Sequence, residues 1–306
     1  MSDASKTVAI FGLGYVGCVS LAGLAFGGTR TIGIDIDDDK VKTIMSGFGT
    51  IVEPKLDELL AKGLDDGLIS ATSNVNEALS QADIALITVG TPHLPSGELD
   101  LSQIFSVCSA IGEFLKSSPK QFTIAIRSTI KPGTCEKIAL LVEEVSGLKA
   151  HEEFFIVSNP EFLREGTAID DYLSPPYVVV GGPQNCGSNE VASLYSALEA
   201  EIKFVDFGTA ETIKYINNSW HAVKVAFGNE IGSICTALEL NSNEIVDLFF
   251  ADTILNISSY YLKPGFPYGG ACLPKDLSGL VSLAREKGIS APLIESTSLS
   301  NEAHIS

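Results

Sequence analysis

The stretch that decides the fold runs from residue 8 to residue 17 and reads Val8-Ala9-Ile10-Phe11-Gly12-Leu13-Gly14-Tyr15-Val16-Gly17. Its four leading apolar residues are typical of a short buried strand, and the apolar run that continues to about Phe26 indicates a helix. Residues 31–35 have the pattern of the next strand, which ends in an acid. Strand, glycine turn, helix and strand in this order predict the first βαβ unit of a parallel sheet.

The three glycines have the spacing of a dinucleotide-binding turn. Gly12 makes the turn, Gly14 lets a pyrophosphate reach the helix N-terminus, and Gly17 lets the helix pack closely on the strand. The alternative is a glycine-rich turn that holds no ligand. The strand before the turn and the helix after it argue against that alternative, because a bare glycine pattern has neither.

The acidic end of the second strand indicates which dinucleotide is bound. Asp35 is placed to accept hydrogen bonds from the ribose hydroxyls of adenosine. Residues 37–39 are all aspartate and would repel a 2′-phosphate, whereas Lys40 would attract one. The balance of these charges predicts NAD rather than NADP.

The alternation of strands and helices continues along the chain. Further strands are expected near residues 69–72, 84–89, 122–127, 154–158, 177–181 and 202–205, with helical stretches between most of them. This rhythm predicts an α/β fold, a Rossmann-type doubly wound parallel sheet, over residues 1–208. Val89-Gly90-Thr91 and Arg127-Ser128-Thr129 follow two of the strands, at the edge where such sheets bind ligands, although each is also compatible with ordinary turn chemistry.

After residue 208 the sequence becomes helical. One helix is expected over about 211–239, because apolar residues recur there every three or four positions: Ile213, Ile216, Trp220, Val223, Phe227, Ile231, Ile234 and Leu238. A helix of this length is typical of a spine between domains or of a dimer core, and we expect a homodimer through it. With shorter helices at 243–251 and 277–287, residues 209–306 form an all-helical central domain.

Cys272 lies in the segment Gly269-Gly270-Ala271-Cys272-Leu273-Pro274-Lys275-Asp276, in which Pro274 marks the start of a helix. Unpaired N–H groups at a helix N-terminus and the adjacent Lys275 both favour a thiolate, so we interpret Cys272 as a nucleophile rather than as a small buried apolar residue. The other cysteines lack these surroundings and are interpreted as structural: Cys18, Cys108, Cys135, Cys186 and Cys235.

Composition excludes several classes of protein. The 306 residues carry a formal net charge of −18, which argues against nucleic acid or an anionic membrane surface as the main partner. The six cysteines are scattered and show no metal-ligand spacing, so free thiols in a reducing cytoplasm are expected, with no disulfide framework and no metal site. Glycines interrupt the apolar residues 8–28 and Lys6 is their one positive flank, so no targeting or transmembrane segment is expected.

These motifs in this order resemble the nucleotide-sugar 6-dehydrogenases, the UDP-glucose/GDP-mannose dehydrogenase family. Besides the glycine turn, the resemblance rests on Val89-Gly90-Thr91-Pro92, Ser128-Thr129, Asn159-Pro160-Glu161-Phe162-Leu163-Arg164-Glu165-Gly166, Lys214 through Asn218, and residues 269–276. Residues 220–224 and 256–266 look more like the GDP-mannose branch than the UDP-glucose branch. Lys263 departs from the pattern, because the GDP-mannose enzymes carry arginine there.

The resemblance implies a reaction in which a sugar C6 alcohol is oxidised to a carboxylate with two NAD. Cys272 adds to the intermediate aldehyde, the thiohemiacetal is oxidised to a thioester, and water hydrolyses the thioester. Lys214 and Asn218 stabilise the oxyanion, and Thr129 joins the hydrogen-bond network. Glu161 and Asp276 are both suited to positioning or deprotonating water, and the sequence does not divide this work between them.

The resemblance also implies two sets of binding residues. The cofactor set is Gly12, Gly14, Tyr15, Val16, Gly17, Asp35, Lys40, Val89, Gly90, Thr91, Thr129 and Glu165, with Glu165 alternatively a substrate or structural contact. The nucleotide-sugar set is Glu161, Phe162, Leu163, Lys214, Asn218, Tyr260, Tyr261, Lys263, Phe266 and Gly269.

Family members continue past the long helix into another Rossmann-like domain that holds much of the nucleotide, and this chain has no such segment. We therefore expect it to bind NAD but to turn over nucleotide sugar poorly or not at all. Two alternatives stay open. One is a truncated, catalytically incompetent module for NAD binding and dimerisation. The other is a β-hydroxyacid dehydrogenase, which also places helices after a Rossmann domain but does not need Cys272.

Overall fold

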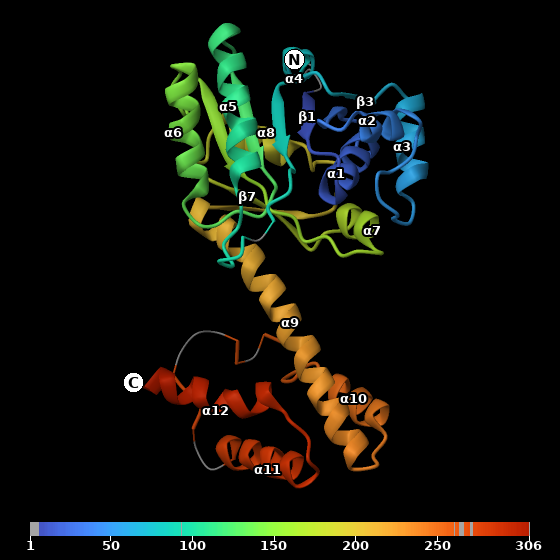
Figure 1. The fold of residues 1–306 in the computed structure, drawn as a ribbon, viewed down its shortest axis with the longest axis vertical. Coiled ribbons are helices and arrows are strands. Elements are labelled where there is room, and N and C mark those ends of the chain that lie inside the picture. Colours follow the sequence, from blue (N-terminus) through green and yellow to red (C-terminus); the bar gives the residue numbers. More distant parts are fainter. Residues whose placement is uncertain (1–5, 93, 260, 263–265, 270–271, 306) are drawn as a thin grey trace. The chain divides into compact units, whose positions relative to one another are not determined.

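The computed structural model describes residues 6–92, 94–259, 261–262, 266–269 and 272–305. The chain divides into two compact units, residues 1–216 and residues 217–306 (Figure 1). The first unit contains the sheet and its helices, and the second contains helices. This arrangement confirms the predicted class, a Rossmann-type sheet followed by a helical part.

The first unit is built on one eight-stranded sheet with the order β3-β2-β1-β4-β5-β6-β7-β8. The order reverses between β1 and β4, which is the switch point where open sheets of this type bind ligands. The strands are β1 Thr7–Phe11, β2 Arg30–Ile34, β3 Ile69–Thr72, β4 Ile84–Ile87, β5 Phe122–Ile126, β6 Phe154–Ser158, β7 Tyr177–Gly181 and β8 Glu201–Val205.

The helices of the first unit lie between the strands. They are α1 Tyr15–Phe26, α2 Asp38–Met45, α3 Leu56–Asp65, α4 Val75–Gln81, α5 Ser102–Ser117, α6 Thr134–Ser146, α7 Ala168–Leu173 and α8 Cys186–Ser193. The long helix α9, Phe207–Ala237, begins in the first unit and continues into the second, where α10 Ser242–Ala251, α11 Leu273–Glu286 and α12 Pro292–Ile305 follow.

The central strands are mostly apolar because each of them is covered on both faces. In β1, Val8 and Ile10 face one core together with residues of α1, α3 and α7, while Ala9 and Phe11 face a second core with residues of α4, α5 and α6. Successive side chains of a strand point to opposite faces, so alternate residues divide between the two cores. The layers seen in Figure 1 follow directly from this alternation.

One strand pair departs from the predicted parallel sheet. β7 pairs antiparallel with β6 through Ser158 and Gly181, and β8 pairs parallel with β7. The link from β6 to β7 contains α7, whose Tyr172 packs against Gly23 of α1. The chain re-enters the sheet at the end from which it left, and such a return makes β7 antiparallel to β6.

Close packing of α1 on the glycine turn fixes the geometry of the first βαβ unit. A Cβ atom placed on Gly17 would lie 1.8 Å from the carbonyl oxygen of Gly12, which is a backbone atom. Gly12 itself has a φ of 97°, in the region that favours glycine. Together the two glycines let the N-terminus of α1 start directly above the end of β1.

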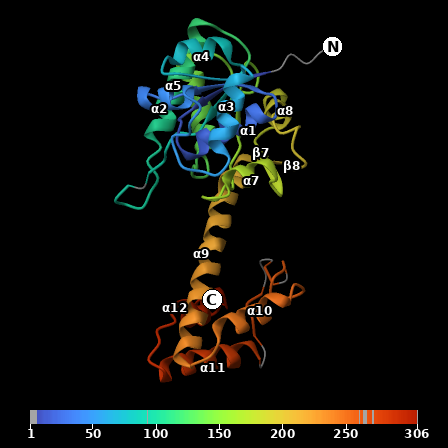
Figure 2. The ribbon, with the colours of Figure 1, turned by 90° about the vertical axis from the view of Figure 1, so that its right-hand side faces the viewer.

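The second unit has a small core. The C-terminal part of α9 packs against α11 and α12 through Ile234, Ala284 and Ile294, with Ile231 and Leu238 beside them (Figure 2). Among its described apolar residues, only Ile234, Cys235, Ala284, Ala291 and Ile294 are buried. Residues 218–229 of α9 are all exposed. The predicted apolar stripe of α9 is therefore packed in its C-terminal half and uncovered in its middle.

Among the residues that the structure describes, none of the helices combines the length and the apolar character that a bilayer span requires.

Gly17→Ala tests the packing of the glycine turn. The new methyl group would meet a backbone oxygen that cannot rotate away, so we expect the free energy of unfolding to fall by about 3 kcal/mol, the upper end of overpacking costs. Gly14→Ala is the matched control, because no described atom lies within 4 Å of a Cβ placed on Gly14; as the N-cap residue it should cost about 1 kcal/mol or less. Urea denaturation measures both variants, and equal losses would contradict this account.

Candidate active site

A cleft of about 1040 Å³ lies at the carboxyl ends of the central strands of the first unit. It begins beside the acidic end of β2, crosses the glycine turn after β1, and ends beside the residues that follow β5 and β6. Predicted site residues make up nearly half of its lining: Gly12, Gly14, Tyr15, Val16, Asp35, Lys40, Val89, Gly90, Thr91, Thr129 and Glu161. The structure thus brings together most of the cofactor set.

The N-terminus of α1 supplies the centre of the cleft. Gly14 is its N-cap residue, and Gly14, Tyr15 and Val16 all line the cleft. The first turn carries no acidic side chain, so the N–H groups and the positive end of the helix dipole are left for an anionic ligand. The open space beside Gly14 is what a pyrophosphate needs in order to approach the backbone.

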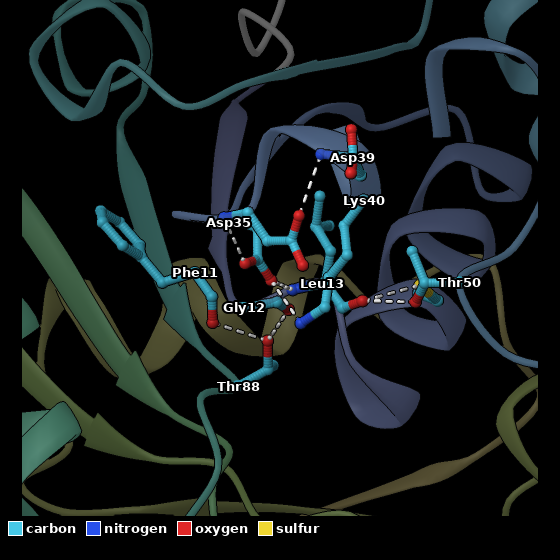
Figure 3. A network of polar contacts seen from close by, with 10 residues as sticks. Phe11, Gly12, Leu13, Asp35, Asp39, Lys40, Thr50 and Thr88 are labelled. Atoms are coloured by element: carbon cyan, nitrogen blue, oxygen red, sulfur yellow. Dashed lines mark hydrogen bonds and ion pairs between the residues drawn. The ribbon is translucent and has the colours of Figure 1, made fainter. Parts of the chain in front are cut away.

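Asp35 lies at the acidic end of the cleft, after β2 (Figure 3). Its Oδ2 accepts the Leu13 N–H at 2.8 Å and lies 3.2 Å from Lys40 Nζ, and its Oδ1 accepts the Asp37 N–H at 3.0 Å. Burial alone would raise the pKa of this carboxyl, but the two N–H groups and the Lys40 ammonium outweigh burial and hold the pKa below its ordinary value. Asp35 is therefore ionised, and its negative charge is paired with the positive charge of Lys40.

Two threonines hold the glycine turn in place. The Thr88 hydroxyl lies 2.8 Å from the carbonyl oxygens of both Phe11 and Gly12, and the Thr50 hydroxyl donates to the Leu13 carbonyl at 2.5 Å (Figure 3). Thr88 follows β4, and Thr50 lies between α2 and α3. The turn after β1 is thus fixed from two sides by residues far away in the chain.

An ion pair marks the other end of the cleft. Lys214 of α9 donates to the Glu161 carboxylate, with Nζ 2.5 Å from Oε1, and to the Glu161 carbonyl at 2.7 Å. The second carboxylate oxygen of Glu161 accepts the Leu163 N–H at 2.6 Å. Both side chains of the pair are buried, so the attraction between them is weakly screened. Phe162 packs edge-on against Tyr177 and lies under the Lys214 ammonium.

A buried polar network supports the segment that carries Glu161. Arg127 donates to Asn159 Oδ1 at 3.0 Å and to the Tyr195 hydroxyl at 2.7 Å, and Asn159 donates to the Val179 carbonyl at 2.8 Å. Asn159 stands two residues before Glu161, at the end of β6. The network fixes the direction in which the chain leaves the sheet, and the Arg127 side chain also lines the cleft.

The far end of the same segment is held by Glu53. Its carboxylate accepts the Gly166 N–H at 2.9 Å and the Ala168 N–H at 2.7 Å, so it caps the N-terminus of α7 across more than a hundred residues of chain. The Tyr15 hydroxyl lies near this acidic region and has no hydrogen-bond partner among the described residues. Burial, with the nearby charges of Glu53, Glu165 and Glu161, raises the pKa of Tyr15, so its phenol stays protonated.

The second unit carries the predicted residues that follow Lys214 in the sequence. Cys272 is the exposed N-cap residue of α11, and its carbonyl accepts the Asp276 N–H at 2.9 Å. The helix begins at Leu273, so Pro274 lies in its first turn as predicted, and residue 277 was too late a start. Asp276 is exposed, and its Oδ1 lies 3.6 Å from Lys275 Nζ. The other predicted residues that are exposed here are Asn218, Tyr261, Phe266 and Gly269.

Some predicted residues lie elsewhere. Gly17 packs against Gly12 beneath the cleft, Leu163 packs on the core, and Glu165 is exposed and not in the cleft lining. Tyr260 and Lys263, both predicted substrate contacts, fall outside the described residues.

Several residues of the cleft carry no signal in the sequence. One face of α5 lines it through Ser102, Gln103, Ser106, Val107 and Ala110, and Val75 contributes too. A helix face becomes part of a site only through tertiary packing, which no local pattern reports. The same holds for Glu53, a single glutamate in a loop.

Comparison with known proteins assigns both parts of the chain. Residues 6–199 match the NAD binding domain of the UDP-glucose/GDP-mannose dehydrogenase family, and residues 208–303 match its central domain. The GDP-mannose 6-dehydrogenase of Pseudomonas syringae pv. syringae is 43% identical over 97% of this chain and 68% of the relative. The UDP-glucose 6-dehydrogenase of Bacillus subtilis (strain 168) is 33% identical over 97% of this chain and 63% of the relative.

A solved structure agrees. A ternary complex of GDP-mannose dehydrogenase from Pseudomonas aeruginosa superposes with a TM-score of 0.95 at 40% identity, covering 97% of this chain and 69% of that one. With both of its parts matched and the cleft in place, the chain belongs to the UDP-glucose/GDP-mannose dehydrogenase family, whose members are NAD-dependent oxidoreductases.

Proposed function

We propose that this protein oxidises the C6 alcohol of a nucleotide sugar, GDP-mannose, to the corresponding uronic acid with two NAD, at the low rate expected from its sequence. The observation that carries the proposal is the cleft, which joins a dinucleotide turn to the buried Glu161–Lys214 pair. The identity to GDP-mannose 6-dehydrogenases, 43% against 33% for a UDP-glucose enzyme, supports the choice of sugar.

The cofactor would lie along the cleft of the first unit. The pyrophosphate would be held by the N-terminus of α1 at Gly14, and the adenosine ribose by Asp35. Val89, Gly90, Thr91 and Thr129 would contact the nicotinamide half. When bound, NAD accepts one hydride from the substrate in each of the two oxidations.

Cys272 would form the covalent intermediate. Its thiolate adds to the carbonyl carbon of the C6 aldehyde, which makes a thiohemiacetal; loss of a hydride and a proton gives a thioester, and water cleaves it to the acid and the free thiol. All six cysteines are free, and only Cys272 and Cys186 are exposed. Cys186 lies beside Glu190, and burial and this acid raise the pKa of its thiol, which disfavours the Cys186 thiolate.

Lys214 and Asn218 would stabilise the oxyanion that forms when sulfur or water adds to the carbon. They stand four residues apart on α9, so their side chains leave the same face of the helix. The nucleotide sugar would contact Phe162, Leu163, Tyr261, Phe266 and Gly269. It would also contact Tyr260 and Lys263, which lie outside the described residues.

The contacts of the two acids support a division of the remaining work. Both carboxylate oxygens of Glu161 are occupied, one by Lys214 and one by the Leu163 N–H, whereas Asp276 is exposed. We therefore assign the positioning of Lys214 to Glu161 and the deprotonation of the hydrolytic water to Asp276.

We also propose that a second copy of the chain covers the middle of α9. Trp220, Val223 and Phe227 are exposed there, and Leu248 and Phe250 of α10 are exposed as well. The second unit buries few apolar side chains of its own, so a second copy would supply the core that it lacks. The six free thiols support the cytoplasm as its compartment.

Asp35→Asn tests the cofactor assignment. The variant keeps an oxygen acceptor but loses the charge, so NAD affinity should fall about tenfold while NADP affinity is retained or rises. Asp39→Asn, an exposed neighbour outside the cleft lining, should change neither. Calorimetric titration of each protein with both dinucleotides decides this, and equal affinity of the unmodified chain for NAD and NADP would refute the assignment.

Cys272→Ala tests the reaction. Without the thiolate the aldehyde has no sulfur nucleophile, so the uronic acid should no longer form, and Cys272→Ser should allow at most slow formation. Cys186→Ala removes the other exposed thiol and should leave the rate unchanged. Mass spectrometric detection of the acid from GDP-mannose and from UDP-glucose registers even slow turnover. Acid production by Cys272→Ala at the unmodified rate would end the thioester mechanism.

Val223→Glu tests the dimer. A charge in the middle of the exposed stripe of α9 should shift the protein from dimer to monomer, because burying an unpaired carboxylate is costly. Leu140→Glu, an equally drastic change at an exposed position of α6, should leave the dimer intact. Sedimentation velocity of the unmodified chain and of both variants measures the oligomeric state. An unmodified chain that is monomeric at high micromolar concentration would contradict the proposal.

A further inference from the structure

We propose that Glu211 is a positioning residue that fixes where Lys214 stands in the active site. The inference rests on the proposed function, in which Lys214 stabilises the oxyanion. It is carried by contacts of Glu211 that serve no other role in that function.

Glu211 is a buried acid on the first turns of α9. Only 3% of the residue is exposed, and its two carboxylate oxygens accept the Gly133 N–H at 2.6 Å and the Cys135 N–H at 2.7 Å. Gly133 is the N-cap residue of α6 and has no side chain with which to cap the helix. Glu211 therefore supplies the cap from another element, and its negative charge meets the positive end of the α6 dipole.

The same turn of α9 carries Lys214. Residues three apart on a helix leave the same face, so Glu211 and Lys214 act from one side of α9 on two neighbouring loops. Glu211 binds the loop after β5, which contains Ser128 and Thr129, and Lys214 binds Glu161 in the loop after β6. One helical turn thus connects the two loops that form the reactive end of the cleft.

A carboxylate of this length is needed at position 211. Aspartate is one methylene shorter and could not keep both bonds without moving α9 toward α6. Glutamine would keep the shape, but its NH₂ group would face a backbone N–H, so one buried donor would lose its acceptor. Either change lets the first turns of α9 shift along or around the helix axis, and Lys214 shifts with them.

A small shift of Lys214 has a large effect on its proposed task. An oxyanion donor acts within a narrow distance range, and a misplacement of about 1 Å costs on the order of a hundredfold in rate. The dinucleotide turn at Gly12–Gly17 and the ribose contact Asp35 belong to other elements, and of the cofactor contacts only Thr129 lies in the loop that Glu211 binds. Loss of Glu211 should therefore lower kcat far more than the affinity for NAD.

The test compares Glu211→Gln with Glu230→Gln in the full 306-residue chain. Glu230 is a matched control because it also lies on α9 and also caps a helix, accepting the Leu293 N–H at 2.7 Å and the Ile294 N–H at 3.0 Å at the start of α12. A brief pulse of acetic anhydride, followed by peptide mass spectrometry, measures how accessible Lys214 is, with the exposed Lys116 as internal reference. This readout does not require turnover, so it separates this inference from the proposed reaction.

We expect Glu211→Gln to raise the labelling rate of Lys214 about tenfold or more and to lower kcat for acid formation far more than the affinity for NAD. Glu230→Gln should lower the midpoint of thermal unfolding about as much as Glu211→Gln does, and the acetylation rate of Lys214 should stay at its unmodified value. If Glu211→Gln does not fold, Glu211→Asp decides, with a smaller rise in labelling expected. Unchanged labelling of Lys214 in the Glu211 variant, or an equal rise in Glu230→Gln, would overturn the inference.

Discussion

The approach of α1 to within contact of the Gly12 carbonyl is the constraint on which the rest of the site depends. This approach is possible because Gly17 has a hydrogen where other residues have a Cβ. As a result, the first residues of α1 line the cleft. Asp35 accepts the Leu13 N–H of the turn. The hydroxyls of Thr88, after β4, and Thr50, before α3, donate to the carbonyl oxygens of the turn. Ligand binding and fold stability thus draw on the same few backbone contacts.

Carboxylates that cap helices from a distance organise the remainder of the chain. Glu53 caps α7, Glu211 caps α6 and Glu230 caps α12, and each accepts two backbone N–H groups. Each bond pair satisfies donors that would otherwise be unpaired at a helix start, and places a negative charge where the dipole favours it. In a chain with a net charge of −18, these acids are structural charges with defined partners, and Glu211 joins α9 to the loop after β5.

Local signals made much of this predictable from sequence. The glycine spacing, the strand rhythm and the long helix depend on neighbouring residues, and the structure confirms the sheet, contains the helix α9 and brings Gly14 and Asp35 into one cleft. What the sequence could not report depends on contacts between distant segments: the antiparallel β7, the face of α5 in the cleft, and the caps made by Glu53 and Glu211. The apolar stripe of α9 shows the same limit, because periodicity does not tell that its middle is exposed while Ile234 is buried.

The central claim is that the acid forms through a bond to Cys272, and trapping that bond tests it most directly. Acid quenching during turnover of GDP-mannose with NAD, followed by peptide mass spectrometry, should show the nucleotide-sugar acyl group on the Cys272 peptide and on no other cysteine, Cys186 included. The adduct should appear with the second hydride transfer and decay as the acid is released. Two NADH formed per sugar while Cys272 stays unmodified throughout would contradict the account.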